Sequence, residues 1–238
     1  MRLISWNCQG AFRKKLGTII PLSPDILVVQ ECESPEKLIF NPTLPKPTDF
    51  HWHSDGSKKG LALLSYSGYK FQLLPEYNPE FKYIIPFQVI HEKGQKKSFT
   101  LFTIWAMNNK ENYYGRYIGQ VWYAIKYYES ILKQPVILIG DFNSNKIWDT
   151  KDRIANYTDV VQILEEKKIH SVYHKYNKLN QGEETHPTFY LFRKKERPYH
   201  IDYCFTSADL FRRIKHFEIG IYEHWIAYSD HMPLIIDF

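Results

Sequence analysis

The sequence predicts an α/β protein in which two β-sheets pack against each other and helices cover their outer faces, an α/β/β/α arrangement. Eight short runs rich in Val, Ile, Leu, Phe and Tyr are typical of strands, and apolar residues at spacings of three and four predict helices between some of them. Strands dominate the middle of the chain, while helices fall early and in the second half. This order favours packed sheets with outer helices over a simple doubly wound sheet.

The individual elements follow from local patterns in chain order. We expect strands at residues 2–8, 25–31, 61–66, 83–90, 98–107, 136–141, 200–206 and 232–238. Apolar stripes predict helices at residues 12–20 and 114–133, and a weaker one at 160–164. Ser34 followed by Pro35 is typical of an N-cap and first helical position, so we expect a short helix after the second strand.

Length and composition indicate one domain that spans residues 1–238. The 238 residues are 44% hydrophobic and can bury one substantial core, and no linker or internal repeat divides them. Three cysteines without a CxxC spacing argue against a disulfide framework and a structural zinc site. No apolar run reaches membrane length, and the N-terminus does not resemble a secretory signal. We therefore expect a cytoplasmic monomer with no membrane association and no obligate protein partner.

The basic residues form clusters beside predicted strand ends. The formal net charge of +5 and the pI near 8.9 are modest but favour a polyanionic partner. The clusters are "FRKK" (12–15), "SKKG" (57–60) and "FRKKERPYH" (192–200), and a solvated surface explains any one of them. Together they predict a rim that faces phosphates, with Arg13, Lys14, Lys59 and Arg193 as candidate substrate contacts.

The strand predicted in "VILIGDFNSN" ends in polar residues. Asp141 and Asn143 lie two apart, so on an extended chain they point the same way and present a carboxylate beside an amide. Gly, Asp, Asn and Ser also form turns, which is an ordinary explanation for the same residues.

Other predicted strands carry polar residues at or beside one end, where a core does not require them. They are Asn7, Glu31, Asp202, Asp230 and His231. Each has an ordinary explanation as a turn residue, a helix start, an ion-pair partner or a hydrogen-bonded histidine. Because sites gather where strands end at one edge of an open α/β sheet, the set together predicts a functional site.

Five of these segments, in this order and at these separations, resemble the signature of the endonuclease/exonuclease/phosphatase superfamily. They are "SWNC", "VVQECE", "GDFNS", "HIDY" and "SDHMP", and the resemblance runs from Asn7 to His231. It implies the deoxyribonuclease I-like fold, a four-layer α/β/β/α sandwich of two mixed or mainly antiparallel sheets. It also implies metal-dependent cleavage of a phosphoester.

The resemblance implies a divalent-metal site at the strand ends. Glu31 would be the main ligand of a Mg²⁺ or Mn²⁺ ion, with Asn7 and Asp230 nearby as ligands or as support for it. The chemistry of these residues agrees, because Mg²⁺ prefers hard oxygen ligands and accepts one or two carboxylates.

The resemblance assigns catalytic roles to four further residues. Asp141 would orient or deprotonate the attacking water, and Asn143 would donate a hydrogen bond to a phosphoryl oxygen. His231, held by Asp202, would stabilise charge on the phosphoryl group or act as the base, and both alternatives stay open. Preorganised donors aimed at developing charge contribute on the order of a few kcal/mol each.

The chain departs from the family pattern in one place. Many relatives carry a Thr-His-Leu-like element at the end of the strand equivalent to 98–107, and this chain has "TIWAMNN", with Trp105 and Ala106 where the histidine would fall. Asn108 or Asn109 could supply a replacement donor, although both also suit a loop. His186, near the basic 193–197 stretch, is a candidate substrate contact.

The substrate most consistent with basic loops around the site is DNA or RNA, which makes the leading prediction a nuclease. The alternatives are a phosphatase or phosphodiesterase for a small or lipid-borne phosphate, and a binding module that has kept the fold without activity. Tyr114, Tyr117 and Tyr127 could stack on bases, although helical aromatics usually fill cores. The sequence identifies no side chain suited to insertion into a duplex, so it does not predict apurinic-site repair.

Overall fold

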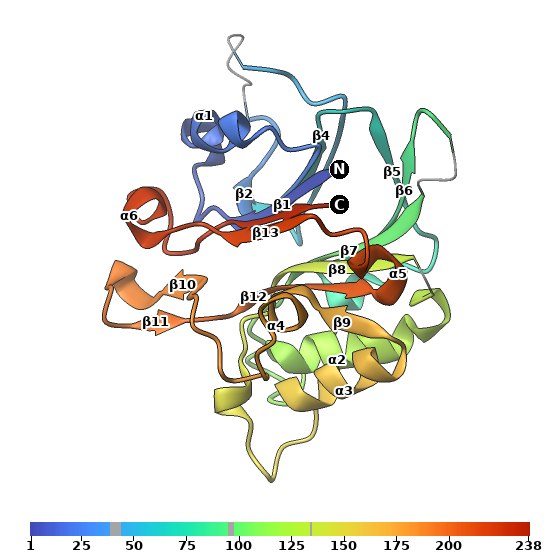
Figure 1. Cartoon of the computed structure of the whole chain (residues 1–238), viewed down its shortest axis with the longest axis vertical. Coiled ribbons are helices and arrows are strands. Elements are labelled where there is room, and N and C mark those ends of the chain that lie inside the picture. Colours follow the sequence, from blue (N-terminus) through green and yellow to red (C-terminus); the bar gives the residue numbers. More distant parts are fainter. Residues whose placement is uncertain (39–43, 95–97, 134) are drawn as a thin grey trace.

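Two six-stranded sheets lie face to face in the computed structural model, which describes residues 1–38, 44–94, 98–133 and 135–238 (Figure 1). The first sheet contains, in spatial order, β13 (His216–Ile219), β14 (Leu234–Asp237), β1 (Arg2–Asn7), β2 (Ile26–Glu33), β4 (Lys59–Ser65) and β3 (Asp49–His53). The second contains β5 (Tyr69–Leu73), β6 (Ile84–His91), β7 (Phe99–Trp105), β8 (Val136–Asp141), β12 (Asp202–Ser207) and β9 (Ile169–Ser171). Both sheets are mixed, since β1 runs parallel to β2 and β7 parallel to β8 while the other neighbours are antiparallel.

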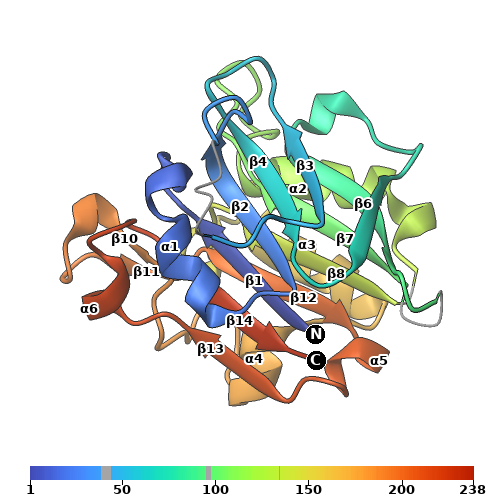
Figure 2. The ribbon, with the colours of Figure 1, turned by 90° about the horizontal axis from the view of Figure 1, so that it is seen from above.

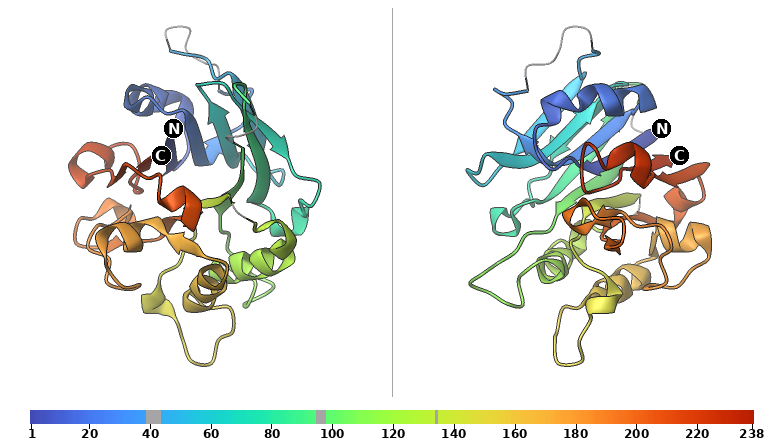
Figure 3. Two further views of the ribbon diagram at one scale, coloured as in Figure 1. Left: turned by 45° about the vertical axis from the view of Figure 1, so that its right-hand side comes forward. Right: turned by 90° about the vertical axis from the view of Figure 1, so that its left-hand side faces the viewer.

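Helices cover the outer face of each sheet, which completes the predicted α/β/β/α sandwich (Figures 1 and 3). Helices α2 (Ile118–Tyr127) and α3 (Tyr157–Glu166) pack their apolar faces on the second sheet. The short helices α1 (Leu16–Ile19) and α6 (Tyr222–Trp225) cover the first sheet. The remaining helices are α4 (Val172–Asn177) and α5 (Ala208–Phe211).

The central core lies between the sheets. Apolar side chains from both inner faces meet there, among them Val28, Leu63, Leu101, Ile139 and Ile236. The central strands are buried on both faces, because helices cover their other side, and they therefore read as continuous apolar runs. The first and last strands pair directly, with Arg2 opposite Asp237, so both ends of the chain meet in the first sheet (Figure 2).

The structure contains all eight predicted strands and adds several that the sequence did not indicate. The added strands β3, β5, β9 and β13 are short or lie at sheet edges, where half-exposed residues weaken the apolar signal. A two-stranded hairpin, β10 (Phe189–Tyr190) with β11 (Pro198–Tyr199), also stands apart from the sheets. The helix predicted at 114–133 forms only as α2 and a short 3₁₀ turn at Glu129–Ile131.

The prediction of a short helix after Ser34 and Pro35 was wrong for residues 35–38, which are the described part of that segment. Residues 35–37 form a turn, in which the backbone N–H groups of Lys37 and Leu38 donate to the Ser34 carbonyl. Residues 39–43 lie outside the described part of the chain. The pattern misled because Ser and Pro also begin turns.

The strand directions bring both sheets' polar ends to one side of the molecule. The parallel pairs β1/β2 and β7/β8 each end there, and β12 begins there because it runs antiparallel to β8, with Asp202 opposite Asp141. Among the described residues, no helix is both long and apolar enough to cross a membrane.

Candidate active site

Asp141 lies buried at the end of β8 and accepts hydrogen bonds from both sheets. Its Oδ2 receives the Asn7 side-chain amide at 3.0 Å and the Asn143 amide at 3.1 Å, and its Oδ1 receives the Asn143 backbone N–H at 2.9 Å. Asn143 turns back to make these bonds because its φ is 49°, a left-handed conformation that Asn tolerates better than most residues. Asn7 reaches across from β1, so this contact joins the two sheets.

Glu31 faces outward because β2 bulges at this residue. The pairing of β2 with β4 shifts register between Val29 and Cys32, and Glu31 has a φ of 57°. A bulge leaves one residue out of the ladder and re-aims its side chain. The Asn7 amide that bonds Asp141 also donates to Glu31 Oε1 at 3.2 Å, which links the two carboxylates through one side chain.

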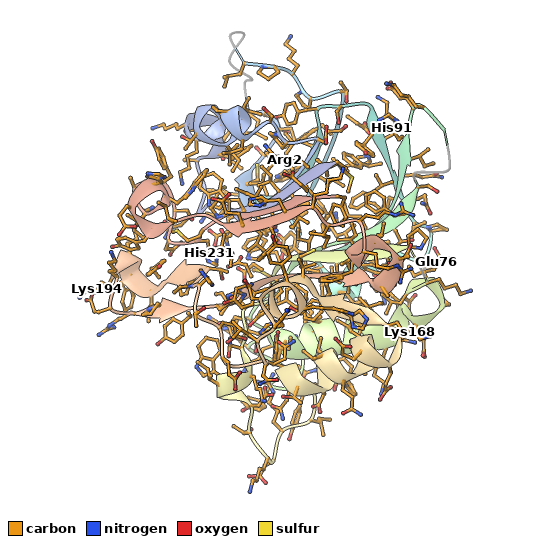
Figure 4. The ribbon with its side chains drawn as sticks, in the orientation of Figure 1. Arg2, Glu76, His91, Lys168, Lys194 and His231 are labelled. Atoms are coloured by element: carbon orange, nitrogen blue, oxygen red, sulfur yellow. The ribbon has the colours of Figure 1, made fainter. Side chains whose placement is uncertain are left out.

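Asp202 and His231 form a buried pair beside Asp141. The Asp202 Oδ2 lies 2.9 Å from His231 Nδ1, and His231 Nε2 points toward Asp141, 4.0 Å from its Oδ2. The ring of Phe189 packs on the imidazole at a centroid distance of 4.7 Å and restrains it. Figure 4 shows His231 beside the β10–β11 hairpin.

The buried carboxylates and imidazole change one another's protonation. Burial and the charge of Asp202 raise the pKa of Asp141 to about 7. Burial lowers the pKa of His231, but the neighbouring carboxylates, Asp202 foremost, outweigh that effect and raise it to about 10. Ligand-type atoms of Asp141, Asp202 and His231 lie within 4.8 Å of one another, so this group could hold a cation or a proton.

Asp230 is connected to the site through Gln9, a residue that sequence reasoning missed. The Gln9 side-chain amide donates to Asp230 Oδ2 at 2.7 Å, and its backbone N–H donates to Asn7 Oδ1 at 3.0 Å. Burial raises the pKa of Asp230. The position of Gln9 two residues after Asn7 was the available signal, but "SWNCQG" does not show that the chain turns there.

The sequence matches the Endonuclease/Exonuclease/phosphatase family over residues 4–231. This chain belongs to that family. Its members hydrolyse phosphoesters, so the chain is a phosphoesterase, as the resemblance of its five strand-end segments to the family implied. No curated protein sequence matches it.

Solved structures of other proteins share the fold of this family member along its whole length. An AP endonuclease from Archaeoglobus fulgidus has a TM-score of 0.70 and 15% identity, with coverage of 100% of this chain and 99% of that chain. A 3′-5′ exonuclease (NExo) from Neisseria meningitidis has a TM-score of 0.65, 15% identity and coverage of 100% and 99%. The endonuclease domain of TRAS1, a telomere-specific non-LTR retrotransposon, has a TM-score of 0.62, 16% identity and coverage of 100% and 97%.

The basic residues predicted to surround the site of this phosphoesterase differ in how near they lie to its central residues. The Lys59 Nζ lies 2.5 Å from Glu31 Oε2, and the Arg193 Nε donates to Gln9 Oε1 at 3.1 Å, so both reach the site. Arg13 pairs with Glu33 on the same strand end as Glu31.

Three other predicted contacts do not reach the central residues in the part of the chain that the structure describes. Lys14 and Asn108 are exposed and have no hydrogen bond to those groups. His186 is exposed, with its Nδ1 3.0 Å from the Tyr173 hydroxyl. The structure therefore does not bring these three side chains into contact with the centre.

The end of β7, where the chain departs from the family pattern, is apolar and buried. Trp105 packs against Tyr83 at a centroid distance of 4.7 Å. Ala106 is buried in the core that α2 and α3 cover, and its backbone carbonyl accepts from the Asn143 amide at 2.9 Å. A hollow of about 810 Å³ begins at the next residues. Its lining includes Lys82, Met107, Asn108, Asn109, Asn112, Tyr123 and Tyr127.

Large exposed aromatic residues stand on the loops around the site. Phe192, at the tip of the β10–β11 hairpin, is 70% exposed and has a left-handed φ of 57°. Trp148 is 45% exposed and packs on Tyr199 of the same hairpin at 5.2 Å. Lys194 lies at the outer end of the hairpin (Figure 4). Sequence reasoning identified the basic residues of this loop but not its exposed aromatic rings.

Proposed function

We propose that this phosphoesterase is a divalent-metal-dependent nuclease that hydrolyses DNA or RNA by in-line attack of an activated water. The observation that carries the proposal is the Asn7 amide, which bonds Glu31 on the metal side and Asp141 on the water side. One residue thereby sets the spacing of the two carboxylates that the reaction needs.

A Mg²⁺ or Mn²⁺ ion fits the oxygen donors of Glu31 and Asp230. Glu31 already faces a cation, the ammonium group of Lys59, which shows that its outward oxygen is accessible to positive charge. Asn7 acts as support, because its amide nitrogen donates to both carboxylates and its oxygen accepts from Gln9. When bound, the ion would neutralise charge on the phosphoryl group and orient it for attack.

Asp141 is the proposed general base, since a pKa near 7 suits a base that works at neutral pH. His231, with its raised pKa, stays an imidazolium and donates to a phosphoryl oxygen from Nε2, while Asp202 fixes the orientation of its ring. Asn143 positions Asp141, because its side-chain amide donates to Asp141 and to the Ala106 carbonyl.

Leaving-group assistance is assigned to the loop after β7. The buried Trp105 and Ala106 offer no acid, whereas Asn108 is exposed in the adjacent hollow and can donate from its amide. We therefore assign Asn108 as the donor to the leaving oxygen or to the phosphate beside it.

The loops around the site support a polynucleotide substrate over a small ester. Exposed Phe192 and Trp148 suit stacking or insertion between bases, and the lysines and arginines near them suit phosphates. Tyr114 and Tyr127 are also exposed and could add stacking surfaces. The names of the structural neighbours, two endonucleases and an exonuclease, agree with this substrate class.

The three buried free thiols fit the reducing cytoplasm, and we propose that the chain works there as a single-domain monomer.

The decisive experiment compares wild type with Asp141→Asn, with Mg²⁺ or Mn²⁺, on single- and double-stranded DNA, RNA and a panel of small phosphate esters. Metal-dependent cleavage of a polynucleotide that the variant loses would support the nuclease. Activity confined to a terminal, small or lipid-borne phosphate would establish the phosphatase alternative instead, and activity that survives EDTA would contradict the metal mechanism.

A further inference from the structure

Lys59 holds its ammonium group against the proposed metal ligand Glu31. Its Nζ lies 2.5 Å from Glu31 Oε2, and the two side chains are 46% and 22% exposed. The lysine stem crosses Gly10, where an added Cβ would lie 3.2 Å from Lys59 Cε and 3.5 Å from Nζ. Gly10 also has a φ of 79°, which favours glycine. Both its backbone conformation and the nearby Lys59 stem therefore disfavour a side chain at this position, and the path of the lysine stays open.

The β-bulge places these two groups together. Beyond the bulge, β2 pairs with β4 so that Glu33 lies opposite Lys59, and the displaced Glu31 turns outward at the same end of the strands. The Glu31 Oε1 accepts from the neutral Asn7 amide, which leaves Oε2 for a cation. In the described part of the chain, Lys59 is the only lysine or arginine in a salt bridge with a proposed metal ligand.

We propose that Lys59 is a tethered counter-ion: it occupies Glu31 Oε2 when no metal is bound, and metal binding releases it toward the substrate phosphate. The inference rests on the metal site of the proposed function. A divalent ion and the ammonium group need the same oxygen and repel each other, so they exclude one another there. The flexible four-carbon stem lets the released ammonium move to a phosphoryl oxygen a short distance away.

This exchange couples the two ligands thermodynamically. The metal weakens the hold of Glu31 on Lys59, and an anion that attracts Lys59 frees Glu31 for the metal. Because such coupling is reciprocal, the metal and the phosphate each increase the affinity of the protein for the other. Lys59 thus acts as a positioning residue that delays metal binding until substrate is present.

The test measures Mn²⁺ binding by the loss of the free-ion electron paramagnetic resonance signal, without turnover. The proteins are wild type, Lys59→Met and Lys59→Arg, each with and without sulfate as a soluble phosphate analogue. The exposed neighbour provides the matched control, Lys58→Met. We expect Lys59→Met to bind Mn²⁺ alone roughly fivefold or more tightly than wild type, a size typical of such couplings. Sulfate should tighten Mn²⁺ binding by wild type and by Lys58→Met but not by Lys59→Met, and Lys59→Arg should bind Mn²⁺ as weakly as wild type.

Equal or weaker Mn²⁺ binding by Lys59→Met than by wild type, including no binding by either, would overturn the inference. Sulfate enhancement that persists in Lys59→Met would overturn it as well. Where wild type binds Mn²⁺, these outcomes are separate from the failure of the proposed function, because an absence of hydrolysis across the substrate panel would leave the Mn²⁺ affinities as measured. No Mn²⁺ binding by wild type would contradict the metal site of the proposed function as well.

Discussion

The two halves of the candidate site differ in how firmly their side chains are held. Asp141, Asp202 and His231 are buried, and short side chains or backbone groups bond them in place. Glu31 and Asp230 lie nearer the surface and are held by the long side chains of Lys59 and Gln9. Under the proposed function this difference divides the work: we expect the buried half to be preorganised for the chemical step and the outer half to exchange partners to admit an ion.

The largest effect is expected in the buried half. Asp141→Asn keeps the side-chain shape but cannot accept a proton, so we expect hydrolysis to fall by about 10³-fold, within the range that general base catalysis contributes. Extra metal should not restore the rate, because the ion does not replace a base. Initial rates across a metal titration test this, and recovery of the variant at high metal would contradict the assigned role. His231→Ala should likewise fold and lose most activity.

Glu31→Gln should impair the outer half of the site through metal binding and not through the chemical step. We expect metal affinity to fall by about 100-fold, because a charged oxygen ligand becomes a neutral amide, and hydrolysis at low metal falls with it. Saturating Mn²⁺ should restore much of the rate, in contrast to Asp141→Asn. A Mn²⁺ titration measures the metal affinity of the variant, and thermal unfolding of the same samples shows whether it folds normally. Unchanged metal dependence of the hydrolysis rate would remove Glu31 from the ligand set.

Two buried histidines differ in the direction of their pKa shift. Burial lowers the pKa of His200, whereas the carboxylates around His231 outweigh burial and raise its pKa. Burial is the main cause that lowers the pKa of His200 from 6.5 to about 4, so the unfolded chain binds a proton that the folded chain does not. The His200 contribution to stability is therefore present above pH 6.5 and is lost as pH falls toward 4. Between pH 7.5 and 5 this loss amounts to about 2 kcal/mol.

His200→Asn is the matched variant, because its amide can replace the His200 Nδ1 that faces the His186 carbonyl at 2.7 Å. By urea unfolding, the free energy of unfolding of wild type relative to the variant should be lower by about 2 kcal/mol at pH 5 than at pH 7.5. A constant difference at both values would show that His200 does not titrate as its burial requires.

The smallest effect is expected at the exposed hairpin tip. Phe192→Ala should weaken binding of a polynucleotide by about tenfold, as loss of one stacked base contact does, and leave hydrolysis of a small ester unchanged. Tyr176→Ala removes an aromatic ring that is 42% exposed on α4, and it serves as the control. Equal losses from both variants, or none from Phe192→Ala, would remove the hairpin from the substrate surface.

Much of the fold was open to prediction because the central strands bury both faces. Their continuous apolar runs indicated eight strands, and the family resemblance indicated the four-layer sandwich that the structure contains. Edge strands such as β3 and β5 were missed, since solvent on one side removes the apolar signal. Ser34 and Pro35 misled because short-range patterns do not distinguish a turn from the first turn of a helix.

By itself, the sequence determined which chemical groups end the strands: the carboxylates of Glu31, Asp141 and Asp202, and the imidazole of His231. Only the tertiary structure decided which of their atoms meet. The bulge that turns Glu31 toward Lys59, the bridge that Gln9 makes to Asp230, and the exposure of Phe192 all depend on contacts between segments far apart in the chain. Local propensity carries no information about such contacts, because they form only when both sheets have packed.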